Sequence, residues 1–122
     1  SEFGPVRGWM ETEFMAKNFV QPGSTIVIAN AGSAAILSGS PVLVGKVVAV
    51  AITDIEAGQV GDGFTEGVFL LPKLSADAIT IGEQVHIKDG EVQLDATDAD
   101  LAGVAWEDAA AGSSTVAVKI NA

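Results

Sequence analysis

The stretch that most restricts the fold is "GEQVHIKDGEVQL", residues 82–94. Asp89-Gly90 lies at its centre, and an Asp-Gly pair supplies the positive backbone φ that a two-residue hairpin turn requires. On both sides of this turn, apolar and polar residues alternate, which is typical of strands that bury one face. The apolar positions are Val85, Ile87, Val92 and Leu94. The stretch therefore predicts an antiparallel β-hairpin.

Six further segments have the composition and the flanking turn residues of short strands. They are residues 25–29, 41–53, 58–67, 68–72, 101–106 and 114–120. The run 41–53 is expected to form two strands joined or bent at Gly45, and 68–72 a buried strand. Residues 75–80 are expected to form one helical turn with Ser75 as its N-cap. Together these segments predict an all-β fold: a small antiparallel barrel or sandwich of about seven or eight short strands, with at most one short helix.

Two parts of the sequence resemble each other. "AVAITDIEAG" (49–58) and "GVAWEDAAAG" (103–112) share Val-Ala, then Asp, then Ala-Gly at a constant offset. Upstream, both have Gly-x-x-Val-x-aliphatic. This order predicts a duplicated β unit around one core, although chance remains open because the match is short. Trp106 takes the apolar place of Ile52, which predicts a buried or interface Trp, and Asp108 and Gly112 are expected to be turn residues.

Composition excludes several classes of function. Sixteen acids face six bases, a net charge of -10, so the chain repels phosphate backbones and is not expected to bind nucleic acid on its own. Such a charge favours solubility or docking onto a basic surface. There is no cysteine, which excludes disulfides, thiolate metal sites and Cys nucleophiles. No apolar run is long enough to cross a membrane.

The first fourteen residues, "SEFGPVRGWMETEF", have no periodicity and differ in character from the remainder. We expect 1–14 to be a tag or leader. It would precede a single β domain over 15–122 that begins with an N-terminal arm, residues 15–24.

The nearest approach to a phosphate-binding loop is "SPVLVGKV", residues 40–47. A P-loop needs Gly at the first position and Ser or Thr after the Lys. Those positions hold Ser40 and Val47, in a strand-rich run. Lys46 is therefore expected to face solvent at a β turn.

The only histidine, His86, falls on the polar face of the expected hairpin, and no Gly-x-Ser-x-Gly motif accompanies it. His86 is more simply interpreted as an exposed strand residue than as a member of a Ser-His-Asp triad. No catalytic or cofactor-binding site is predicted from it.

Two groups of acids have the composition of catalytic or metal-binding sites. Paired carboxylates can perform acid–base chemistry, but turn chemistry explains why both copies keep an Asp between a strand and Ala-Gly. Clustered carboxylates can bind Ca²⁺, but residues 95–100 lack the Gly and closing Glu of the helix-loop-helix calcium motif. Neither a catalytic nor a metal site is predicted. The two groups are Asp54, Glu56, Glu107 and Asp108, and Asp95, Asp98 and Asp100.

The order of several segments resembles the small capsid cement, or decoration, proteins of tailed bacteriophages. These segments are "MAKNFVQPGSTIVI" (15–28), "SGSPVLVGKVVAVAITD" (38–54), "EGVFLLPK" (66–73), "IGEQVHI" (81–87) and "GVAWEDAAAGSSTVAVKI" (103–120). Members of this family have often carried the label of a predicted RecA/RadA-type phage recombinase. A RecA-like ATPase is a larger α/β domain with a working P-loop, which this sequence lacks.

The resemblance implies a non-enzymatic virion protein without a cofactor. It would bind the major capsid protein on the outside of the assembled head, commonly as a homotrimer, after assembly in the host cytoplasm. The N-terminal arm is free to add to another chain's sheet edge, although Phe19 could instead pack on its own core. The candidate capsid or subunit interface residues are Lys17, Asn18, Phe19, Val20, Gln21 and Trp106.

Two other functions stay open from the sequence. One is a nucleotide-dependent recombination factor, supported by the label and by the weak 40–47 match. The other is a sugar- or surface-binding β module on the phage head, which would require exposed aromatic residues.

Overall fold

The computed structural model describes residues 17–122, and the expected tag or leader, 1–14, lies outside the described residues. These residues form nine strands and no helix, so the all-β prediction is confirmed. The strands are β1 (Thr25–Ala29), β2 (Pro41–Val44), β3 (Val47–Ala51), β4 (Val60–Phe64), β5 (Val68–Pro72), β6 (Gln84–Lys88), β7 (Glu91–Gln93), β8 (Asp100–Ala105) and β9 (Thr115–Ile120).

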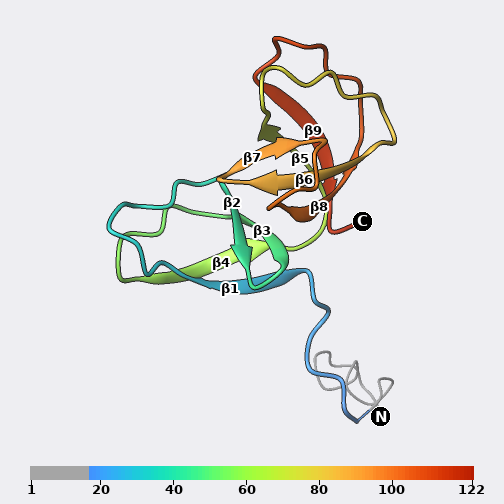
Figure 1. The fold of residues 1–122 in the computed structure, drawn as a ribbon. Helices are drawn as coiled ribbons and strands as arrows, with labels where there is room; N and C mark the ends of the chain where they lie inside the picture. Colours follow the sequence, from blue (N-terminus) through green and yellow to red (C-terminus); the bar gives the residue numbers. More distant parts are fainter. Residues whose placement is uncertain (1–16) are drawn as a thin grey trace.

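The strands make two antiparallel sheets that follow each other along the chain (Figure 1). The first has the order β1-β4-β3-β2, and the second has the order β5-β9-β8-β6-β7. Strand for strand, β1, β2, β3 and β4 correspond to β5, β6, β8 and β9. The second sheet repeats the first and adds β7, which the hairpin at Asp89-Gly90 supplies. We call these two halves unit 1 (residues 25–64) and unit 2 (residues 68–120).

Contacts between the loops support the same correspondence. In each unit an isolated antiparallel bridge closes the loops, and a glycine N–H donates to the carbonyl at the end of β3 or of its equivalent β8. The bridges are Ile36–Ile55 and Ile79–Ala109, and the glycine bonds are Gly39–Ala51 and Gly82–Ala105. The duplication inferred from the sequence is thus visible in the hydrogen bonding as well as in the strand order.

A buried polar residue follows the first strand of each unit. Asn30 in unit 1 donates from Nδ2 to the carbonyls of Ala34 and Ile55, each at 2.9 Å. Lys73 in unit 2 is only 2% exposed. It donates from Nζ to the carbonyls of Leu74, Ser75 and Asp77. Each side chain organises the loop that follows it, because buried carbonyls need donors.

Buried side chains form two hydrophobic clusters, of which the larger joins the two units. The smaller lies within unit 1 and contains Ile28, Ala49, Ala51 and Ile55. The larger lies on the inner face of unit 2 and also receives Val48 and Val50 from β3 of unit 1. Burying these apolar side chains stabilises the fold by about 1.5–3 kcal/mol for each large residue.

Unit 2 curls toward a half-barrel. Its two outermost strands approach each other where Lys73 forms a parallel bridge with Val92. The Leu74 N–H also donates to the Val92 carbonyl at 2.9 Å. The C-terminal end of the β5 edge is therefore occupied, and among residues 17–122 no strand pairs with its N-terminal part.

Asn121 joins the two units. Its side chain accepts from the Val48 N–H at 3.0 Å and donates to the Val48 carbonyl at 2.8 Å, as a neighbouring strand would. It also donates to the Thr65 carbonyl at 2.7 Å. The end of β9 is thereby fixed against β3 of unit 1.

Local predictions met with different outcomes. Asp89 and Gly90 have φ of 53° and 80°, as the predicted hairpin turn requires, and Gly45 turns the chain between β2 and β3. The helical turn predicted at 75–80 is wrong: this segment is a turn followed by the Ile79–Ala109 bridge. That pairing outweighs the local preference of Ser75 for a helix start.

Candidate binding surface

The N-terminal arm is exposed over its described length, from Lys17 to Gly23. Figure 1 shows it leading away from both sheets. Phe19 is 47% and Val20 89% exposed, so neither packs into the core of its own chain. Lys17, Asn18 and Gln21 are exposed as well. Near the base of the arm, Thr65 donates from its hydroxyl to the Gly23 carbonyl and from its N–H to the Ser24 carbonyl.

The outer face of unit 2 carries an apolar surface beside the β5 edge. Strand pairing and the Trp106 N–H bond to the Ala117 carbonyl align its side chains in two rows. The rows are Leu70–Ala117–Trp106 and Val68–Lys119–Val104. Neither contains an acid, although the chain has sixteen. An aromatic side chain among apolar neighbours is typical of interface cores, and Lys119 is the one charged residue in these rows.

Trp106 is half exposed, with 50% of its surface accessible. The Lys119 Nζ lies 5.3 Å from the centre of its ring, close enough for a cation–π contact. The prediction of a buried Trp is therefore wrong within the single chain, while its use in an interface stays a prediction. The equivalent Ile52 is also partly exposed.

Residues 68–72 were predicted to be a buried strand, and this is only half correct. Leu71 is fully buried, but Leu70 is 63% exposed and Val68 is exposed as well. A continuous apolar run looks the same in a sequence whether both faces or one are covered. These exposed residues were missed as site candidates for that reason.

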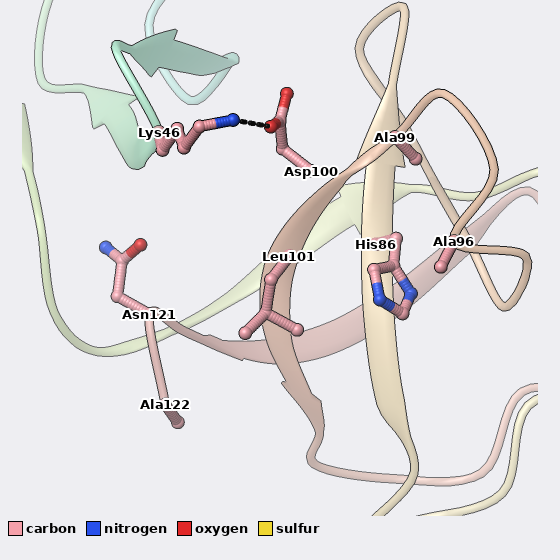
Figure 2. A pocket seen from close by; sticks show the side chains of 8 residues that line it. All are labelled: Lys46, His86, Ala96, Ala99, Asp100, Leu101, Asn121 and Ala122. Atoms are coloured by element: carbon pink, nitrogen blue, oxygen red, sulfur yellow. Dashed lines mark hydrogen bonds and ion pairs between the residues drawn. The ribbon is translucent and has the colours of Figure 1, made fainter.

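An open hollow of about 600 Å³ lies at the end of this face, between the units (Figure 2). Lys46 reaches over it from the β2–β3 turn, with Nζ 3.4 Å from Asp100 Oδ1. Lys46 is 90% exposed, as predicted for a turn residue. Leu101 and Asn121 form part of the lining.

His86 also lines this hollow. The prediction that His86 is exposed is wrong, because the residue is half-buried. Its Nδ1 is buried without a hydrogen-bond partner among the described residues. Ala96 and Ala99, from the loop before β8, line the same hollow (Figure 2). No hydrogen bond joins His86 to a Ser and an acid in the described part of the chain, so the geometry gives no triad.

The repeated aspartates serve the fold. Asp54 Oδ1 accepts from the Ser38 N–H at 2.8 Å, and Asp108 Oδ1 accepts from the Ile81 N–H at 2.7 Å. The Asp54 bond thus connects the loop after β3 to the loop before β2, and the Asp108 bond connects the loop after β8 to the loop before β6. The turn prediction is confirmed for Gly112, which has φ of 94°.

We expect Asp108→Ala and Asp54→Ala each to lower the free energy of unfolding by about 1 kcal/mol, since each removes a charge-assisted acceptor from a backbone N–H. Urea unfolding followed by circular dichroism would measure this. Glu107→Ala is the matched control, an exposed acid beside Asp108. Equal stability of Asp108→Ala and the control would contradict the structural role.

The acidic loop 95–100 makes its own turns. Asp95 Oδ1 accepts from the Thr97 N–H at 2.9 Å, and this backbone bond, followed by the Thr97 side chain, lowers the pKa of Asp95 below its ordinary value. Over residues 17–122, no group of three or more His, Asp or Glu side chains has metal-binding geometry.

Residues 40–47 form part of the β2–β3 hairpin, whereas a P-loop joins a strand to a helix. None of the described residues belongs to a helix that could cross a membrane.

One protein-family model matches nearly the whole described chain. The family model for the phage cement protein matches residues 20–120. Comparison with curated protein sequences and with solved structures gives no significant match. The match covers both units and the end of the arm, and it agrees with the resemblance seen in the order of sequence segments. The chain belongs to the phage cement protein family.

Proposed function

We propose that the protein binds the outer surface of the assembled phage head, through the major capsid protein, and stabilises the capsid without catalysis. Family membership supports a structural role in a phage. The observation that carries the proposal further is the pair of uncovered surfaces, the arm around Phe19 and Val20 and the face around Trp106. Exposed apolar surface bordered by polar residues marks interaction sites.

Binding alone is sufficient for this role. A protein that binds the expanded shell, and not the separated capsomers, stabilises the shell by mass action. Self-association into a trimer would match local threefold symmetry. Several linked contacts would then raise the overall affinity well beyond that of one contact. In this proposal the protein sits on the exterior of the head in the virion, after assembly in the host cytoplasm, and needs neither cofactor nor nucleic acid.

The proposal predicts that purified protein co-sediments with undecorated, expanded heads of its cognate phage. Unexpanded heads of the same phage are the matched control, because they contain the same capsid protein in a different arrangement. We expect saturable binding to expanded heads and at least about tenfold weaker binding to unexpanded ones, a difference of about 1.4 kcal/mol. Absence of binding to expanded cognate heads would overturn the proposal.

A second candidate, a sugar-binding module on the phage head, gains support from half-exposed Trp106 on a sheet face. Trp fluorescence titrated with host surface polysaccharide would test it. A recombination factor has no comparable support, since residues 40–47 form a hairpin.

A further inference from the structure

We propose that the arm of one copy, residues 17–21, docks along the free edge of β5 and the adjoining outer face of unit 2 in a second copy. This inference rests on the self-association part of the proposed function and names the two surfaces that meet. It is independent of whether the assembled protein binds a phage head.

The first argument is the uncovered arm. Val20 is almost fully exposed, and Phe19 has nearly half of its surface in solvent. Within residues 17–21, no backbone group is hydrogen-bonded to either sheet in the described structure. Lys17 and Asn18 lie in a turn, and residues 19–21 have no regular structure. A segment with neighbouring apolar side chains and free backbone groups can become extended and add to a sheet edge.

The second argument is the free edge of β5. The Gly67 carbonyl accepts from the Ile120 N–H, and the Lys73 N–H donates to the Ser114 carbonyl. Because backbone direction alternates along a strand, the odd-numbered residues of β5 face β9. The N–H and C=O groups of Val68 and Leu70 therefore point away from the sheet. A strand edge with unpaired groups and exposed apolar side chains is a template for another chain.

The third argument comes from the duplication. Val50 in unit 1 is the equivalent of Val104 in unit 2. Val50 is buried against unit 2. In unit 2 no other strand of the described residues covers the same face. Where unit 1 has the charged Asp62 beside exposed Val27, unit 2 has Ala117 beside Leu70. The one charged side chain in the two rows of unit 2 is the cation of Lys119, whereas the equivalent rows of unit 1 contain the acid Asp62.

The fourth argument is the distribution of charge. Residues 17–53 contain two lysines and no acid, whereas residues 54–122 contain thirteen acids and three lysines. Lys17 is the only charged residue of the arm, and exposed Glu66 lies just before β5. A contact between unlike ends of two copies brings opposite charges together, and a contact between like ends does not. A head-to-tail contact of this kind closes into a ring when its rotation permits.

Cysteine cross-linking tests the contact in the full chain, because the native sequence has no cysteine. Val20→Cys protein is mixed with Leu70→Cys protein and treated with a short bismaleimide, which spans a range of strand registers. The expected product is a covalent dimer formed at least about ten times faster than with Leu37→Cys in place of Leu70→Cys, since docking raises the effective concentration. Leu37 is 59% exposed, which matches Leu70.

The outcomes are separable. Equal rates for the Leu70→Cys and Leu37→Cys mixtures would overturn the inference, as would an intramolecular link in a monomeric chain that carries both Val20→Cys and Leu70→Cys. Val68→Cys gives a second position on the same edge if Leu70→Cys fails to fold. Heads play no part in this experiment, so a failure here is distinct from a failure of co-sedimentation.

Discussion

Replacing Gly103 by alanine is expected to destabilise the fold strongly. A Cβ at this position would lie 2.0 Å from the Lys119 carbonyl oxygen and 3.1 Å from the Ile120 Cα. Both are backbone atoms of the neighbouring strand, so no side chain can move aside. Gly103 lies where the β6–β8 register shifts, and its φ is 151°.

The clash requires β8 and β9 to separate in the middle of unit 2. We expect a loss of about 3 kcal/mol or more, against a total stability of about 5–15 kcal/mol for a typical domain. Thermal unfolding by circular dichroism would show a midpoint lowered by about 10–20 °C, or no cooperative transition.

Gly82→Ala is the matched control for Gly103→Ala. Gly82 also has positive φ, 89°, but nothing lies within 4 Å of the added Cβ. Its cost is therefore conformational strain alone, about 1 kcal/mol. If both variants were equally stable, the close approach of β8 and β9 at Gly103 would be wrong.

The second large effect is expected for Lys73→Met. Methionine retains most of the aliphatic stem but removes the ammonium group that donates to the carbonyls of Leu74, Ser75 and Asp77. Leaving buried acceptors without a donor costs about 1–3 kcal/mol for one group. We expect a total loss of about 2–4 kcal/mol, because several carbonyls are affected together.

Urea unfolding would measure the loss, with Lys88→Met as control. Lys88 is exposed at the end of β6, and its replacement should change stability by less than about 0.5 kcal/mol. Equal midpoints for the two variants would contradict the role assigned to Lys73. A larger loss in Lys73→Met would support the view that this side chain organises the loop after β5.

The sequence predicted best where the cause is local. Asp89-Gly90 is a turn because these two residues accept positive φ, and the flanking alternation places Val85 and Ile87 in the core. The strand bounds around Gly45 follow from similar chemistry. Such features need no knowledge of distant contacts.

Features that depend on distant contacts were predicted less well. The partners of Asp54 and Asp108 lie 16 and 27 positions away, so the repeat indicated a shared role without revealing the bonds. Burial of Trp106 was expected from its position in the repeat. Equivalent faces of the two units nevertheless have different neighbours, and a sequence repeat cannot distinguish a covered face from a free one.

The arm continues directly into β1, which pairs with β4 over five residues, from Thr25–Phe64 to Ala29–Val60. A pull on the arm along the direction of β1 therefore acts parallel to the strands. The ladder between β1 and β4 is then sheared, with its hydrogen bonds strained together, and is not opened one bond at a time. Attachment through the arm would give this small protein a mechanically resistant anchor.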